Sequence, residues 1–299
     1  MKTITFQAHL LILLATILIA GSFLASDKLS GLINPFSLTL LRFVGASLIL
    51  FPFILYKKRY REKLLSTLPR ALVISLFYSI FFICFFEALT ITTTLNTGTL
   101  YTLVPFVTAL LCWFFLKQRL NIKQLGIYLL GALGTAWVVF NGDIDSLLSF
   151  SLNNGDLIFL AGAFSMCCYS LSMKLMYKND EMIVLVFCIL VGGSVWMALA
   201  LLFTGQPLDW DLLQRDSLLN MAYLIIAATL ASVYLFQKTT VLLGPRRVMA
   251  YVYLNPGFVA ILLFIVDGIQ IPLVVIPGIL LSSLATVFIQ KDIENHKIN

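Results

Sequence analysis

Two charged side chains stand inside long apolar stretches of the sequence, Arg42 within 35–56 and Glu87 within 71–91. A buried carboxylate can bind a proton or an amine, and a buried guanidinium can hold a carboxylate. Two hypotheses follow from this pair. Either the two groups form an ion pair that joins the stretches, or Glu87 is a proton or amine site and Arg42 is its counter-ion or a carboxylate anchor.

Two prolines lie in the middle of further apolar stretches, and polar residues precede each of them. A proline removes one backbone hydrogen bond and frees a carbonyl, which in a membrane helix requires a polar or water-filled neighbourhood. We therefore expect a binding region around two helix breaks, although the same side chains suit hydrogen bonds between helices or an interfacial aromatic belt. Besides Arg42 and Glu87, the predicted binding residues are Asn96, Thr99, Tyr101, Tyr169, Tyr234, Tyr251 and Asn255, with helix breaks at Pro105 and Pro256.

Motifs of catalysis, metal binding or nucleotide hydrolysis do not accompany these residues. The sequence has no GxxxxGK[ST] loop, no HExxH and no GxSxG. Its five cysteines all lie in apolar stretches without metal-ligand spacing, and His9 and His296 lie too far apart in sequence to suggest a site. We expect no enzyme activity, no metal, no cofactor and no direct use of ATP.

The composition defines the setting of these groups. Of 299 residues, 60% are hydrophobic and 11% are charged, against roughly 25% charged in an ordinary soluble domain. The mean hydropathy is +0.98. So few charges cannot coat the surface of a soluble fold of this size. The chain is therefore expected to be an all-α integral membrane protein, and a soluble enzyme or a nucleic-acid-binding protein is excluded.

Ten stretches are long and apolar enough to cross a bilayer, which takes roughly 20 residues in a helix. Their apolar runs are continuous, without the period-two alternation of barrel strands, so helices are expected. The first stretch also resembles a signal peptide, but the repeat described below needs it as a retained helix. The predicted spans are 8–26, 35–56, 71–91, 95–116, 122–141, 157–177, 182–204, 218–237, 248–266 and 271–290.

Basic residues cluster in every second connection. All of the 20 Lys and Arg except Lys28, Arg42 and Arg215 fall on one side of the predicted topology, Lys297 included. Because lysine and arginine accumulate on the cytoplasmic side of short loops, both termini are predicted to be cytoplasmic, in a bacterial-type inner membrane. The bias also explains the net charge of +6, so no nucleic-acid partner is needed.

An internal repeat appears when the chain is shifted by 151 residues. Pro105 then falls on Pro256 and Thr135 on Thr286, and the first five spans align with the last five. Five is odd, so the second half enters the membrane from the opposite side, which is the inverted repeat typical of secondary transporters. We predict two repeats, 1–148 and 149–299. A duplicated membrane domain without transport is the alternative.

Several short patterns resemble the drug/metabolite transporter superfamily, of the EamA-like type. They are Leu41-Arg42-Phe43, Glu87-Ala88-Leu89, Leu103-Val104-Pro105, Gln124-Leu125-Gly126 with Gly131 and Gly134, Leu243-Gly244-Pro245-Arg246-Arg247 and Leu254-Asn255-Pro256. The family usually has a Gly-Glu pair after the fourth and ninth spans, where this chain has Lys117-Gln118 and Asp267-Gly268. The resemblance implies ten helices around a central cavity, with the fifth and tenth at the periphery.

Repeat and resemblance together predict a secondary transporter of small metabolites that works by alternating access, with export as the expected direction. The resemblance implies amino acids, related metabolites or drugs as substrates. Proton coupling through Glu87 and facilitated diffusion both stay open. The rival hypotheses are an uptake permease for one metabolite and a non-transporting membrane scaffold. The expected partners are the substrate and membrane lipid, and the chain is expected to be a monomer or a homodimer.

Overall fold

A computed structural model describes residues 2–29, 32–149, 152–213 and 217–295. Arg215 and Lys297, which entered the charge bias, lie outside the described residues. Throughout the described ranges the chain is helical and contains no strand. Ten helices are long and apolar enough to cross a membrane, which confirms the predicted number of spans.

Seven spans are single α-helices, and three are interrupted. The single ones are α1 (Lys2–Asp27), α2 (Pro35–Tyr56), α3 (Lys58–Leu89), α6 (Ile122–Val139), α8 (Asn154–Met176), α9 (Met182–Thr204) and α14 (Ile276–Asn295). Short helical turns lie in the connections: α7 (Ile144–Leu148), η1 (Trp210–Leu212) and η5 (Leu273–Val275).

The helix α3 is longer than the span predicted over 71–91, because it begins at Lys58. Residues 58–70 carry six charged side chains, and a search for long apolar runs cannot include them. They nevertheless continue the same helix, with Pro69 inside it. This basic extension of α3 becomes important below, since it reaches the other half of the chain.

Both predicted helix breaks occur just before their prolines. Span four consists of α4 (Thr94–Tyr101) and α5 (Val104–Leu116), and Pro105 lies in the first turn of α5. Span nine consists of α12 (Pro245–Met249), the 3-10 helix η4 (Ala250–Leu254) and α13 (Asn255–Asp267), with Pro256 in the first turn of α13. A first helical turn has no internal partner for its N–H groups, so it tolerates proline.

Span eight has an interruption that no sequence signal announced. It begins as α10 (Leu218–Ile225), continues as the π-helix η3 (Ile226–Ala231) and ends as α11 (Ser232–Leu243). The segment contains neither proline nor glycine. Short π-helical turns inside α-helices are rare and occur frequently at functional sites.

Helix contacts repeat when the two halves are exchanged. In the first half α1 packs against α11 and α13 of the second, and in the second half its counterpart α8 packs against α3 and α5 of the first. Two further pairs, α2 with α9 and α6 with α14, join equivalent helices. The bundle is therefore built from two inverted five-span halves, as the shift of 151 residues predicts.

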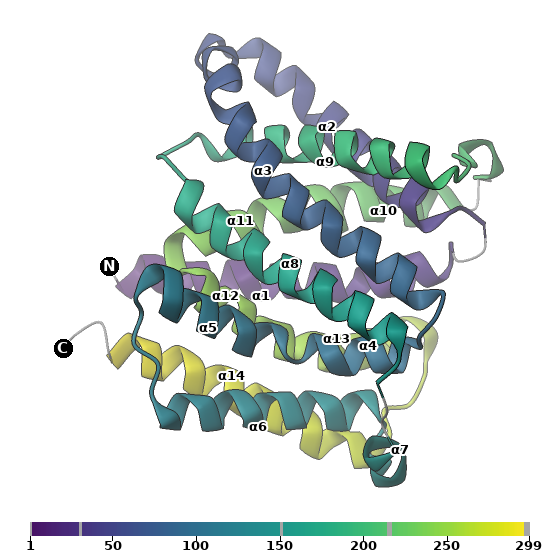
Figure 1. Cartoon of the computed structure of the whole chain (residues 1–299), viewed down its shortest axis with the longest axis vertical. Coiled ribbons are helices and arrows are strands. Elements are labelled where there is room, and N and C mark those ends of the chain that lie inside the picture. Colours follow the sequence, from purple (N-terminus) through teal and green to yellow (C-terminus); the bar gives the residue numbers. More distant parts are fainter. Residues whose placement is uncertain (1, 30–31, 150–151, 214–216, 296–299) are drawn as a thin grey trace.

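The pair α6 and α14 lies at one side of the bundle (Figure 1), which agrees with the peripheral place expected for spans five and ten. Glycine allows this pair to come close, because a Cβ on Gly134 would lie 2.7 Å from the Ser282 backbone nitrogen of α14. A Cβ on Gly131 would overlap the ring of Tyr253 in η4. Two of the three glycines noted in span five thus serve packing within the chain, whereas Gly126 faces open space.

Figure 1 also shows that α1 begins and α14 ends at the same end of the bundle, as an even number of crossings requires. We call it the basic end, because the connections at 57, 117–121, 177–181 and 244 lie there. The opposite end, with the described connecting residues 28–29, 32–34, 90–93, 205–213 and 268–275, is called the far end.

Candidate functional site

The two halves meet in a group of aromatic and polar side chains, which we call the central cluster: Arg42, Tyr78, Tyr169, Thr229, Phe236 and Gln237. Tyr78 of α3 stacks on Tyr169 of α8, with ring centroids 4.6 Å apart. Tyr169 also stacks on Phe236 of α11 at 6.1 Å, and its hydroxyl accepts a hydrogen bond from Gln237 Nε2 at 3.3 Å. The rings of Tyr169, Phe236 and Tyr78 thus form a continuous stack across the two halves.

Arg42 reaches this cluster from α2. The residue is 9% exposed, and its Nε donates a hydrogen bond to Thr229 Oγ1 on the π-helix at 3.0 Å. The next residue, Phe43, stacks on Tyr78 at 5.6 Å. Arg42 therefore contacts Thr229 of the second half, and its neighbour Phe43 contacts Tyr78 of the first half.

The expected ion pair between Arg42 and Glu87 is wrong. The ion pairs formed by described residues do not include either side chain. Glu87 is half-buried and lies about 13 Å further along α3 than Tyr78 by helical rise. The contact between Phe86 and Phe36 at 5.7 Å places Glu87 well towards the far end. The two side chains therefore lie at different depths along the bundle.

Asn96 lies at the far end, in a network built around Asp156, which is fully buried. Asn96 Nδ2 donates to Asp156 Oδ2 at 3.0 Å, and the Thr92 hydroxyl donates to the same carboxylate. Asp156 also accepts from the Asn153 N–H at 2.9 Å, while Asn153 caps α8 in return. The sequence carried a signal for this group, since Asn153 and Asp156 have the spacing of a capping box.

The remaining predicted residues surround the central cluster rather than form one site. Tyr101 of α4 packs between Phe81 and Phe159, at 5.8 and 6.3 Å. Thr99 is half-buried on α4, Pro105 is buried, and Pro256 is half-buried. Tyr234 of α11 lies below the Lys238 ammonium, which is 5.8 Å from its ring centroid.

Tyr251 and Asn255 belong to the interrupted span nine. The Tyr251 hydroxyl and His9 Nδ1 form a hydrogen bond of 2.8 Å, between η4 and α1. The separation of His9 and His296 in the sequence gave no sign of this contact. Asn255 is half-buried, and its Oδ1 is buried with no hydrogen-bond partner among the described residues.

Contacts between the halves close the basic end. The Arg70 guanidinium of α3 binds the Asp180 carboxylate of the α8–α9 connection at two points, 2.7 and 2.8 Å. Arg59 and Lys63, from the basic extension of α3, form ion pairs with Glu181. Burial alone would raise the pKa of Asp180, but hydrogen bonds from Arg70 and the Lys178 N–H outweigh it and lower that pKa below its ordinary value.

Contacts between the halves are also present at the far end. Lys28, at the end of α1, pairs with Asp267 at the end of α13 at 3.5 Å. Asn96 and Asp156, described above, join α4 to α8. Bonds therefore link the two halves at both ends in this conformation, with the central cluster between them.

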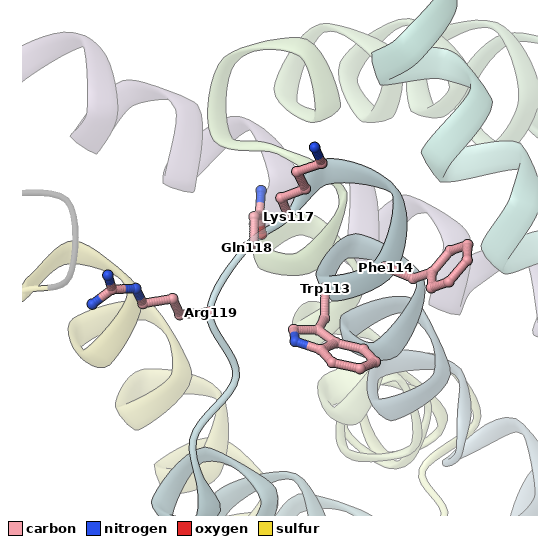
Figure 2. A pocket seen from close by; sticks show the side chains of 5 residues that line it. All are labelled: Trp113, Phe114, Lys117, Gln118 and Arg119. Atoms are coloured by element: carbon pink, nitrogen blue, oxygen red, sulfur yellow. The ribbon is translucent and has the colours of Figure 1, made fainter.

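Two hollows in the described part of the chain lie away from the central cluster. A hollow of about 310 Å³ lies at the basic end of α5, lined by Trp113, Phe114, Lys117, Gln118 and Arg119 (Figure 2). A smaller one of about 70 Å³ lies between α13 and α14. Neither hollow is lined by a residue of the central cluster.

Metal binding finds no support in the described part of the chain. It contains no group of three or more His, Cys, Asp or Glu side chains that could hold a metal ion. The five cysteines are free thiols. The chemistry available at the centre is thus one guanidinium, hydroxyl and amide groups, and aromatic faces.

Comparisons with known proteins agree with this architecture. The model of the EamA-like transporter family matches the chain twice, over residues 6–140 and 153–290. An uncharacterized transporter of Archaeoglobus fulgidus is 24% identical over 261 residues, which cover 86% of this chain and 88% of that protein. The uncharacterized transporter YyaM of Bacillus subtilis is 29% identical over 126 residues, and this match spans only 41% of its length.

A solved structure shares the fold. A protein crystal structure superposes with a TM-score of 0.75 and 20% identity, covering 94% of this chain and 95% of the other. The likeness therefore extends over nearly the whole length of both chains. With the family model matched in each half, the chain belongs to the EamA-like transporter family and is a multi-pass membrane transporter.

Proposed function

We propose that the protein is a secondary exporter of small metabolites that works by alternating access, in a plasma membrane with both termini in the cytoplasm. The observation that supports this most is the exchange relation between the helix contacts: α1 packs on α11 and α13 as α8 packs on α3 and α5. Equivalent packings in inverted halves allow one conformation to open one side and its counterpart to open the other.

The contacts at the two ends support the same mechanism. At the basic end Arg70 binds Asp180, and at the far end Lys28 binds Asp267 and Asn96 binds Asp156. Each set joins the first half to the second. Opening one side while the other stays closed requires breaking one set of contacts and keeping the other.

The central cluster is the proposed substrate site, because it lies between the two sets of contacts and draws on both halves. We propose that Tyr101, Tyr169, Tyr234, Tyr251 and Asn255 line the route on either side of it. Glu87 is the proposed proton-coupling group. It is half-buried on α3, and no cation of the described residues lies within ion-pair distance.

Two spin-label pairs in one purified protein test alternating access. Leu32 and Ile269 are exposed at the far end, and Ser66 and Lys178 are exposed at the basic end; each pair joins the two halves. Spin labels are attached to cysteines at these positions, in a variant without the five native cysteines. Double electron–electron resonance then measures the distance between the two labels of each pair. We expect opposite changes in the two pairs when the protein is moved from detergent to lipid or is given a ligand found by thermal shift.

Transport direction needs vesicles of known orientation. Inside-out vesicles should accumulate a labelled metabolite that stabilises the purified protein, and right-side-out vesicles should release it. Net accumulation in right-side-out vesicles would show uptake instead. Distances that stay fixed in both spin-label pairs, together with no movement of any stabilising metabolite, would favour the non-transporting scaffold.

A further inference from the structure

Arg42 is the buried charge at the centre of the bundle. Among the described residues the buried charged side chains are Arg42, Asp156, Arg246 and Arg247. Asp156 lies at the far end, and Arg246 and Arg247 lie in α12 at the basic end. The central cluster therefore carries one full positive charge and no carboxylate.

The guanidinium of Arg42 is only partly used. Its Nε donates to Thr229, while the two terminal nitrogens make no hydrogen bond to any described residue. Arg246 differs, because all three of its nitrogens donate, to Tyr128, Gln124 and the Arg119 carbonyl. A buried charge without an anion is costly, and the two terminal nitrogens present the fork that binds a carboxylate at two points.

Aromatic rings form the wall next to this fork. Phe43 stacks on Tyr78 and meets Phe82 at 6.0 Å edge to face, and Tyr78 stacks on Tyr169. A ligand that reaches Arg42 between the halves would thus meet aromatic faces, which favour a planar or apolar body. The Thr229 hydroxyl, which accepts from Arg42 Nε at 3.0 Å, supplies a polar group next to the charge.

The repeat puts this charge in one half only. Tyr78 and Thr229 are equivalent under the shift of 151, and α2 contacts both. The equivalent of Arg42 is Gly193 on α9, where a Cβ would lie 2.9 Å from the Phe43 ring. No second arginine can therefore occupy that position, and one cation serves the whole site.

We infer that the Arg42 fork and the rings of the central cluster form a binding site for an organic monocarboxylate with an apolar or aromatic body. This inference rests on the proposed function and narrows its substrate class. The site offers no carboxylate for an ammonium group, since Glu87 lies about 13 Å further along α3 than Tyr78. A carboxylate without an amine is therefore preferred over a zwitterion of the same size.

Four probes that share one ring and differ in their polar group test the inference: phenylacetate, phenylacetamide, phenethylamine and phenylalanine. Thermal shift of the purified protein measures binding, and counterflow in proteoliposomes measures movement. Phenylacetate should raise the melting temperature most and be exchanged fastest. Preference for the amide, the amine or phenylalanine would overturn the inference and leave transport intact.

Variants separate charge from packing. Arg42→Gln should weaken phenylacetate binding about tenfold or more, as expected for a lost charge-assisted hydrogen bond, whereas Arg246→Gln should not change the order of the four probes. If Arg42→Gln does not fold, Arg42→Lys is used in its place to test the inference. This variant keeps the positive charge and loses the two terminal guanidinium nitrogens. Unchanged phenylacetate preference in the folded variant would overturn the inference.

Failure of the inference and failure of the proposed function give different results. If none of the four probes binds or moves while the spin-label pairs still change in opposite directions, the monocarboxylate site is wrong and alternating access stands. If the pairs also stay fixed and no stabilising metabolite moves, both proposals fall.

Discussion

Arg70 of α3 and Asp180 of the α8–α9 connection form a two-point ion pair across the two halves, with N–O distances of 2.7 and 2.8 Å. Arg70 also donates to the Met176 carbonyl at 2.8 Å. Both side chains are largely shielded from solvent, at 17% and 8% exposed. A shielded, bidentate pair contributes more than an ordinary surface salt bridge, so it should both stabilise the fold and hold the basic end closed.

Asp180→Asn should lower the free energy of unfolding by about 1–2 kcal/mol, because charge-assisted hydrogen bonds are lost. It should also lengthen the distance between labels at Ser66 and Lys178. The matched control is Glu62→Gln, which removes an exposed pair with Lys58 and should have almost no effect. A basic-end distance that does not change in Asp180→Asn would contradict the role of the pair in closure.

The ion pair between Arg70 and Asp180 makes the stability of the fold depend on pH, and the direction of this dependence follows from the pKa of Asp180. The pKa of Asp180 in the folded protein lies below its ordinary value of 3.8, so the folded state holds this proton less tightly than the unfolded state. The stabilisation is then complete above about pH 4 and is lost as the pH falls through the lower, folded-state pKa. The difference in melting temperature between wild type and Asp180→Asn should be constant from pH 7 to 5 and shrink below pH 4.

Glu87 provides the test of proton coupling. Glu87→Gln keeps the size of the side chain but cannot bind and release a proton, so we expect a pH gradient to lose its effect on transport while counterflow continues. Asp145→Asn, in the exposed loop helix α7, is the control and should keep the gradient effect. Unchanged coupling in Glu87→Gln would remove Glu87 from the mechanism and favour facilitated diffusion or another group.

The fold followed from features that a single sequence displays well. Long apolar runs, alternating basic connections and the paired Pro105 and Pro256 are local or periodic signals, and each reflects a strict demand of the bilayer on the backbone. The π-helix η3, which packs against α1 and α2, has no such signal, because its segment contains neither Pro nor Gly. The basic extension of α3 was missed because it lies outside the apolar run from which the span was predicted.

The candidate site was harder to predict, because it depends on which way side chains face. Arg42 was singled out by its charge, but its partner Thr229 lies in the other half, and no spacing in the sequence links the two. Tyr78 and Gln237 were missed because a tyrosine and a glutamine in apolar helices are common. Asn96 was expected beside the substrate, yet it binds Asp156 at the far end, and the capping-box spacing of Asn153 and Asp156 pointed to that role.

The close contact of α6 and α14 allows a stability test that leaves the central cluster untouched. In Gly134→Ala the new Cβ would lie 2.7 Å from the Ser282 backbone nitrogen and 3.0 Å from the Gly278 carbonyl oxygen. Backbone atoms cannot move aside as a flexible side chain can, so the helices must separate, at a cost of about 1–3 kcal/mol. Gly126→Ala meets nothing within 4 Å and, in a helix, should be neutral or slightly stabilising. Melting curves of the two variants in the same detergent compare them directly. Equal melting temperatures would mean that the two helices do not pack as closely in solution, and a fall in Gly134→Ala alone would confirm the contact.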